Sequence, residues 1–201
     1  MVRRIDRLIE PYAKGPLGPL WDSTLNPSKY TYGMGNRGVT SIASGSNFMA
    51  RGVVPKTRGK WYFAVLIVSE SAASGFIAGV APSSSPTGSG TYPGADAASY
   101  GCQFDRSPVA KFNNAIATNI SGTTCGAGDV AKVAVDFEGG GIYFGRNGDW
   151  YNGCDPARSI SPILTFTAKT TQFYAAMNEG FLAVLQNSIT YPPPAGFDWW
   201  E

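Results

Sequence analysis

Apolar and polar residues alternate over short stretches along most of this chain. Between residues 133 and 137, Val133, Val135 and Phe137 occupy every second position. Successive side chains of a β-strand point to opposite faces, so this spacing predicts a strand. A second alternating run begins at residue 142 after three consecutive glycines, and Asn147-Gly148 separates it from a third. Because tight hairpin turns need positive φ angles, the segment 133–151 is predicted to be a three-stranded antiparallel meander with Gly148 at positive φ.

Further strands are predicted at short, regular intervals. Their ranges are 60–68, 75–82, 99–104, 128–137, 141–148, 161–167, 171–178 and 181–186. No segment after residue 20 keeps a helical period over ten residues. Many short strands with glycine-rich turns predict an all-β fold, an antiparallel β-sandwich. The stretch 81–98, rich in Ser, Pro and Gly, is the one long loop, and such loops are often functional.

The first 20 residues differ from the rest of the chain. Ile5 and Leu8 share one face of a short predicted helix, with Arg3 and Arg4 on the other. A proline ends this helix, and two Gly-Pro pairs, which interrupt regular structure, precede the first segment with a strand-like pattern. We assign residues 1–20 to an N-terminal arm, which either caps the open end of the sandwich or docks onto a neighbouring subunit.

The other end of the chain is rich in proline and aromatic residues. We assign residues 21–187 to the sandwich and 188–201 to a C-terminal tail. Phe197, Trp199 and Trp200 lie within four residues, and exposed on a monomer they would form an apolar patch of the kind that marks contacts. The tail is therefore predicted to dock onto a partner through these rings, or else to cover a sheet edge. On the docking interpretation, replacing all three rings with Ser leaves the sandwich folded.

Composition limits the classes of function. Apolar residues make up 43% of the 201-residue chain, enough for a sizeable core, while charged residues make up only 15%. The net charge of +2 is too small, and the basic residues are too scattered, to indicate a nucleic-acid partner. No apolar run is long enough for a signal peptide or a membrane span, so the protein is expected to be made and used without standard secretion or membrane insertion.

Cysteine usage points to thiols without a chemical role. Cys102, Cys125 and Cys154 are far apart in sequence, and no Cys-x-x-Cys pair is present. An odd number leaves at least one cysteine without an intramolecular partner. Reduced, inert thiols are favoured over a disulfide.

The sequence contains few candidate catalytic residues. The chain has no histidine, which removes Ser-His-Asp, Cys-His and His-ligated zinc sites. Asp136 and Glu138 could form a glycosidase pair, but Glu138 adjoins the triple-glycine turn. Loop acids such as Asp96 and Asp105 could bind calcium, yet no Asp-x-Asp-x-Asp-Gly loop is present. We expect no enzyme activity, no cofactor and no metal site.

Five motifs in order resemble the SPRY domain. They are "GKWYFAV", "FIAGVAP", "YGCQF", "GDVAKVAVDFEGGGIYFGRNGDW" and "SPILTFTAKTTQFYAAMNEG", and the match covers roughly residues 20–186. The resemblance rests most on Gly59–Phe63 and on Gly128, Asp129, Asp136, Ile142, Phe144, Asn147 and Gly148. It implies two antiparallel sheets packed as a bent, concanavalin-like sandwich. It also implies that loops at one end bind partners and that the domain catalyses nothing.

The ending "PAGFDWW" is similar to the Pro-x-Gly-Phe-x-x-Trp ending of tailed-bacteriophage virion proteins that carry a SPRY-like module. This second resemblance implies a non-catalytic virion component, associated with the tail or a fibre or decorating the capsid. Its partners would be other virion proteins in an oligomeric assembly and a host-surface protein or glycan, and it would be made in the host cytoplasm without a signal peptide. The alternatives are an intracellular SPRY-type peptide-binding adaptor and a sandwich-fold glycosidase.

Loop aromatics beside polar groups are the best candidates for contact with a partner, because such rings suit sugar stacking and protein hot spots. Two sets stand out, one around the long loop and one just past the Asn-Gly turn. In the alternative interpretation, Trp150 folds back over the core. The predicted contact residues are Tyr92, Asp96, Tyr100, Asp149, Trp150 and Tyr151.

Overall fold

The computed structural model of the 201-residue chain describes residues 18–42, 47–69, 75–166, 171–177, 182–186 and 190–201. The arm residues predicted to dock, which are Arg3, Arg4, Ile5 and Leu8, lie outside the described residues. Within the described chain, Gly18 and Pro19 are already buried, and Trp21 is fully buried in the core. The packed domain therefore includes the last residues assigned to the arm.

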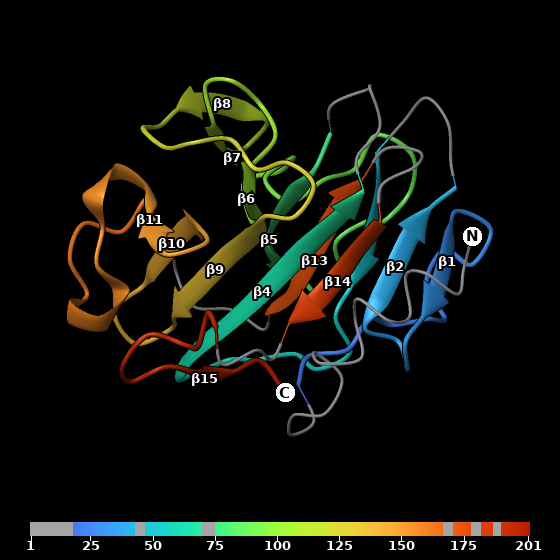
Figure 1. Ribbon diagram of the computed structural model, residues 1–201, viewed down its shortest axis with the longest axis horizontal. Helices are drawn as coiled ribbons and strands as arrows, with labels where there is room; N and C mark the ends of the chain where they lie inside the picture. The colour runs from blue at the N-terminus through green and yellow to red at the C-terminus, as the bar shows by residue number, and fades with distance from the viewer. Residues whose placement is uncertain (1–17, 43–46, 70–74, 167–170, 178–181, 187–189) are drawn as a thin grey trace.

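The larger sheet contains nine strands of the described chain, and Figure 1 shows its main path running across the molecule from β1 to β11. The order is β1-β2-β14-β4-β9-β10-β11, with β12 added to β10 and β15 added to β4. The strands are β1 (Tyr30–Gly33), β2 (Gly38–Ser41), β4 (Lys60–Ser69), β9 (Val130–Asp136), β10 (Gly141–Arg146), β11 (Asp149–Trp150), β12 (Leu164–Thr165), β14 (Leu182–Gln186) and β15 (Asp198–Trp199).

The second sheet contains six strands and lies behind the first in Figure 1. Its order is β3-β13-β5-β6-β7-β8, and all its pairs are antiparallel. The strands are β3 (Phe48–Arg51), β5 (Ile77–Pro82), β6 (Tyr100–Gln103), β7 (Ala110–Asn113), β8 (Ile116–Asn119) and β13 (Thr171–Met177). The predicted all-β sandwich of two antiparallel sheets is confirmed.

The core lies between the sheets and is rich in aromatic rings. Phe63 of β4 stacks on Phe173 of β13 with ring centroids 4.8 Å apart, so the central strands of the two sheets are in direct contact. Phe104 packs edge-on against Phe144 of β10 at 6.1 Å. Every residue of β9 and of β13 is buried, including the polar side chains of Lys132, Asp136 and Gln172, so both strands are covered on both faces.

The meander predicted at 133–151 is present as β9, β10 and β11. β10 pairs with both neighbours, and Arg146 lies opposite Asp149, which leaves Asn147 and Gly148 as a two-residue turn. The predicted positive φ at Gly148 is wrong. Asn147 has φ 49°, whereas Gly148 lies outside the left-handed region. Of the three consecutive glycines 139–141, the last of which begins β10, Gly140 alone has a left-handed φ, at 65°.

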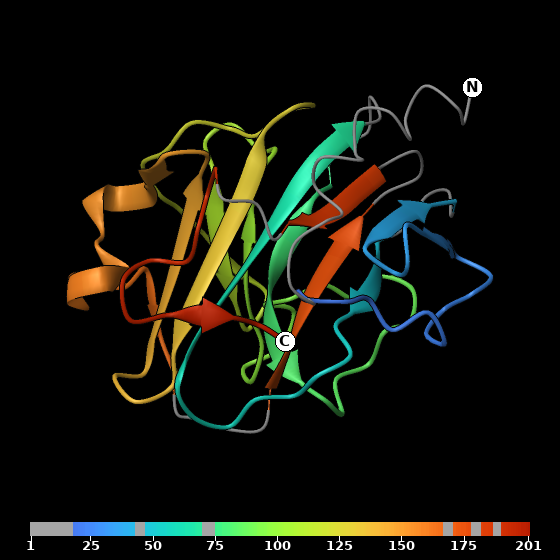
Figure 2. The ribbon, with the colours of Figure 1, turned by 60° about the horizontal axis from the view of Figure 1, so that its bottom comes forward.

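The C-terminal tail is part of the sandwich. β14 ends at Gln186 opposite Ala64, and β15 then pairs in parallel with β4 at Trp61 and Tyr62, on the stretch that β14 leaves open. Figure 2 shows β15 crossing the lower end of this sheet. Of the two interpretations of the tail, docking through three exposed rings is not supported, because Phe197 and Trp200 are 6% and 0% exposed and the tail instead pairs with β4.

Several strands were not predicted one by one, namely β1, β2, β3, β7, β8 and β15. β7 and β8 form a hairpin whose turn residues, Asn114 and Ala115, both have positive φ. β8 is exposed at all four positions, so its sequence carries no alternation of apolar and polar residues. The remaining regular elements are two short 3-10 turns, η2 (Tyr151–Gly153) and η3 (Pro156–Arg158). In the part of the chain that the structure describes, no helix has the length and apolar character to cross a membrane.

Candidate functional site

A hollow of about 230 Å³ opens beside the β10–β11 turn. We call it the hairpin hollow. Half-buried Trp150 and exposed Asp149 come from β11, while the segment before β9 supplies the facing wall. The lining residues are Ser121, Gly122, Thr123, Arg146, Asp149, Trp150, Tyr151, Asn152 and Gly153. Trp, Tyr and Arg are the residue types most enriched at protein-binding hot spots.

A network around Asp129 holds the hairpin in place. The Asp129 carboxylate accepts hydrogen bonds from the Gly126 N–H (2.9 Å) and the Asn147 amide (2.8 Å), and it pairs with Arg146 at 2.8 Å. Burial alone would raise the pKa of Asp129, but these donors outweigh it and hold the pKa below its usual value. Asn147 also accepts from the N–H of Val130 at 2.8 Å. Hydrogen bonds and an ion pair from the Gly-Asp and Asn-Gly motifs therefore connect the start of β9 to the end of β10.

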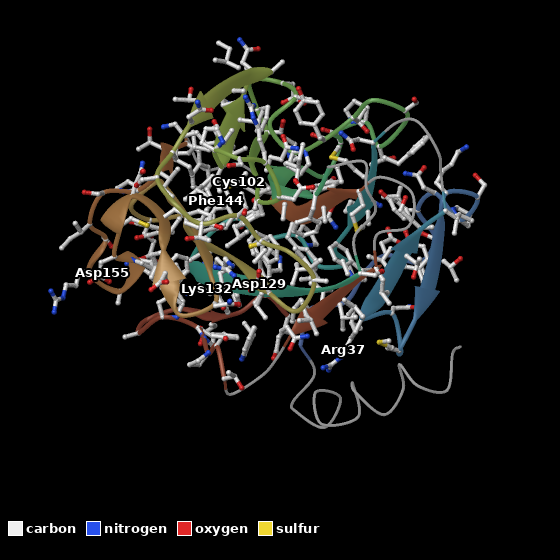
Figure 3. The ribbon with its side chains drawn as sticks, turned by 45° about the horizontal axis from the view of Figure 1, so that its top comes forward. Arg37, Cys102, Asp129, Lys132, Phe144 and Asp155 are labelled. Atoms are coloured by element: carbon white, nitrogen blue, oxygen red, sulfur yellow. The ribbon has the colours of Figure 1, made fainter. Side chains whose placement is uncertain are left out.

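Lys132 lies beneath the indole of Trp150. Its side chain is on β9, 5% of its surface is exposed, and its ammonium lies 4.2 Å from the centre of the Trp150 ring. Figure 3 labels Lys132 on β9 and shows Asp155 at the outer edge of the molecule. Burial lowers the pKa of Lys132 to about 8, although Asp149 and Cys154 act in the opposite direction. A cation on one face of the ring holds Trp150 in a fixed orientation.

The facing wall is tied to the turn η2 by Asn152. Its side-chain oxygen accepts hydrogen bonds from the Ser121 N–H (2.7 Å) and the Ser121 hydroxyl (2.8 Å). Asn152 has φ 55°, a conformation that asparagine tolerates better than most residues. Both walls of the hairpin hollow are therefore pre-formed, which lowers the entropic cost of binding.

Tyr151 is a core residue, so its assignment as a contact residue is wrong. It is 2% exposed, its hydroxyl donates to the carbonyl of Thr123 at 2.8 Å, and its ring packs on Phe104 at 5.9 Å. Its role is to anchor the wall of the hollow from behind. A Cβ on Gly122 would lie 2.2 Å from the Tyr151 ring, so that loop position requires glycine.

The other three predicted contact residues belong to a different part of the molecule. Tyr92 and Asp96 lie in the loop between β5 and β6, and Tyr100 begins β6 of the second sheet. Tyr92 packs edge-on against Phe112 at 5.6 Å, and Tyr100 packs on Phe166 at 5.8 Å. The residues lining the hairpin hollow include none of the three. The six predicted residues thus do not form one site.

The carboxylate pair considered for glycoside cleavage has a structural explanation. Asp136 is buried and accepts hydrogen bonds from the N–H groups of Glu138 (3.0 Å) and Gly139 (2.8 Å), while Lys60 pairs with it at 2.9 Å. Burial would raise the pKa of Asp136, yet these donors hold it below its usual value. A general acid needs a raised pKa. Asp136 therefore stabilises the β9–β10 turn.

The three cysteines are free and buried, as the sequence favoured. Burial raises the pKa of Cys125 to about 12 and that of Cys154 to about 11, and it raises the pKa of Cys102 as well. Thiols with such pKa values are protonated at neutral pH and unreactive. Among the described residues, no three His, Cys, Asp or Glu side chains are grouped so as to hold a metal ion.

Lys132 makes a testable contribution to stability. In the unfolded chain its pKa is about 10.4, so between pH 8 and 10 the unfolded state binds more protons than the native state. Stability gained from this group therefore rises with pH. We expect the free energy of unfolding of the wild type, minus that of Lys132→Met, to increase by about 2 kcal/mol from pH 7 to pH 10.

Urea denaturation at several pH values measures this difference. Lys29→Met is the control, because Lys29 also places its ammonium over an aromatic ring, 5.0 Å from the centre of Phe48, but is half-buried rather than buried. A pH-independent difference for Lys132→Met would show that its ammonium is solvated in the native state.

No protein-family model matches the sequence, and no curated protein matches it either. Solved structures do match. The PSpry domain of TRIM65 superposes with a TM-score of 0.62 at 14% identity, covering 93% of this chain and 95% of that one. The SPRY domain of human HERC1 gives 0.61 at 16% identity over 84% and 98%, and a further human SPRY domain gives 0.59 at 15% over 80% and 96%. The chain has the SPRY fold.

The three matches cover almost the whole of each SPRY structure, so the two-sheet architecture described above is that of a complete SPRY domain. The SPRY resemblance seen in the sequence is therefore confirmed at the level of fold. At these identities the matches establish the fold of this chain but not its function. Its functional residues therefore have to be inferred from its own sequence and structure. Sequence reasoning missed Lys132, Arg146 and Asn152. The signals were a lone lysine inside the apolar run "VAKVAV" and polar residues flanking the Asn-Gly turn.

Proposed function

We propose that this protein is a non-catalytic binding module that recognises a protein partner through the hairpin hollow. The observation that carries the proposal is the half-buried Trp150 ring, fixed by Lys132 beneath it and flanked by Arg146 and polar loop groups. An aromatic anchor in a pre-formed polar hollow is the arrangement expected of an interface hot spot. The SPRY fold, a rigid sandwich that displays loops, supports this proposal.

We propose further that the module is a component of a bacteriophage virion, associated with the tail or capsid. The support is the resemblance of the Pro-x-Gly-Phe-x-x-Trp ending to endings of phage virion proteins. In this chain the same ending also has a structural role, since Phe197 and Trp200 are buried. The ring contacts made by the tail therefore do not favour a docking role, and the proposed contact with other virion proteins is assigned to the hairpin hollow instead.

Quantitative mass spectrometry of purified particles tests the proposal. With the chain present in wild-type particles, Trp150→Ala should lower its copy number sharply, because truncating an aromatic anchor costs about 2 kcal/mol, roughly thirtyfold in affinity. Ile116→Ala is the matched control, since Ile116 is 63% exposed on β8 and away from the hairpin hollow. Both purified variants should melt near the wild type.

Three results would change the account. Absence of the chain from wild-type particles would overturn the virion role and leave the intracellular adaptor. Equal incorporation of both variants would overturn the hairpin hollow as the contact. Cleavage of a glycan that is lost in Asp136→Asn and Glu138→Gln variants, with the fold retained, would replace binding by catalysis.

A further inference from the structure

A second hollow, of about 330 Å³, opens at the beginning of β4. We call it the tail hollow. It exists because β15 pairs in parallel with β4, which places Asp198 opposite Trp61. The lining residues are Lys56, Trp61, Asp198, Trp199 and Glu201. Buried Tyr62 lies between the two hollows, since it packs against Trp150 at 6.4 Å and against Trp199 at 5.1 Å.

The tail hollow already holds a cation of the chain itself. The Lys56 ammonium lies 3.4 Å from the centre of the Trp61 ring and donates to the backbone oxygen of Glu201 at 2.5 Å. The Trp61 indole N–H donates to the carbonyl of Arg58 at 2.6 Å, so the ring is fixed in this orientation. A positive charge over the face of tryptophan is the most favourable cation–π arrangement.

The charges around this ring also favour a cation. Asp198 and Glu201 are exposed, and among the described residues no ion pair involves either carboxylate. Burial lowers the pKa of Lys56, while Glu201 and Asp198 act to raise it, so both acidic residues act on the ammonium. The hollow thus combines an aromatic face with two carboxylates available to pair with a cation.

The Lys56 side chain can leave without disturbing the sheet. Its backbone is held separately, because Lys56 and Thr171 exchange both N–H to carbonyl hydrogen bonds, at 2.7 and 2.9 Å. A guanidinium is better suited than an ammonium to this position, since it is planar, stacks on aromatic faces and pairs with carboxylates through two donors. The resident lysine is therefore replaceable by a stronger ligand.

We propose that the tail hollow binds an arginine side chain of a partner protein, which takes the place of the Lys56 ammonium over Trp61. This contact is separate from the hairpin hollow and does not depend on Trp150. Lys56 acts as an internal competitor that keeps the Trp61 face covered until an arginine arrives.

Titration with N-acetyl-arginine-amide, followed by the NMR signal of the Trp61 indole N–H, tests this inference. N-acetyl-citrulline-amide is the neutral probe of the same shape, and Trp61→Phe assigns the signal. We expect arginine to shift the signal and citrulline to leave it unchanged. Lys56→Met should tighten arginine binding about threefold or more, as loss of a competing cation–π contact predicts. Asp198→Asn combined with Glu201→Gln should weaken it by a similar factor.

Lys29→Met is the matched control, because Lys29 also lies over an aromatic ring but away from the tail hollow, and it should leave binding unchanged. A structural role of Lys56 would give weaker or unchanged binding in Lys56→Met, which overturns the inference. Equal shifts with arginine and citrulline, or no shift with arginine in either the wild type or Lys56→Met, overturn it as well. Loss of partner recognition in Trp150→Ala would not change arginine binding at the tail hollow, so each proposal can fail without the other.

Discussion

Trp200→Ala is expected to destabilise the domain by about 3–5 kcal/mol, the largest effect of any tail substitution. The Trp200 ring is fully buried and contacts Phe63, Phe137 and Phe173 at centroid distances of 6.0, 6.1 and 5.8 Å. Its indole N–H also donates to the carbonyl of Val54 at 2.7 Å. The substitution therefore leaves a cavity between the sheets together with an unpaired carbonyl.

Thermal and urea unfolding measure this effect against Trp199→Ala. Trp199 is the adjacent residue but is half-buried and packs against the single ring of Tyr62, so its truncation should cost about 1 kcal/mol. For a domain of this size, Trp200→Ala should lower the Tm by about 10 °C. Equal Tm values for the two variants would show that the tail is not part of the core.

Gly79→Ala is expected to destabilise the domain by about 3 kcal/mol or more. Gly79 lies in β5 opposite Gly101, and a Cβ there would lie 2.0 Å from the carbonyl oxygen of Tyr100 and 2.7 Å from the Gly101 Cα. Both atoms belong to the backbone of the adjacent strand, so no side chain can rotate to relieve the clash. The β5–β6 pair has to separate to admit the methyl group.

Gly148→Ala is the control for this substitution. A Cβ on Gly148 would meet no heavy atom within 4 Å, and its φ lies outside the left-handed region. Its stability should therefore remain within about 0.5 kcal/mol of the wild type. If Gly148→Ala unfolds the protein while Gly79→Ala does not, the strand register of the second sheet is wrong.

The ranges predicted from alternation in the sequence contain β5, β6, β9, β10, β12, β13 and β14, and β4 extends one residue beyond its predicted range. Alternation did not reveal β1, β2, β3 and β7, although each of them has buried positions. β8 was missed because its residues are all exposed. The Asn-Gly turn was located correctly, but which of its two residues takes a positive φ depends on the backbone of the surrounding hairpin, since Asn147 and Gly148 can both adopt it.

The tail shows why burial could not be predicted for Phe197 and Trp200. An aromatic cluster has the same sequence whether it covers a neighbouring subunit or fills its own core. The difference depends on where β14 ends, because β15 pairs with the two residues of β4 that lie beyond that end. For the site, Asp149 is exposed and Trp150 is half-buried, and their contact with a partner stays a prediction. The sequence could not show that Tyr151 turns inward or that Tyr92 and Tyr100 belong to the other sheet.

Hydroxyl-radical footprinting of Trp150 in purified particles, compared with the isolated protein, tests the central claim most directly. The Trp150 side chain is half-buried in the free domain, and burial against a partner would exclude radicals from the part that remains exposed. We predict that oxidation of Trp150 falls about tenfold in the particle, as expected for a fully desolvated anchor, while Ile116 oxidises at the same rate in both states. An unchanged Trp150 oxidation rate in particles that contain the protein would contradict recognition through the hairpin hollow.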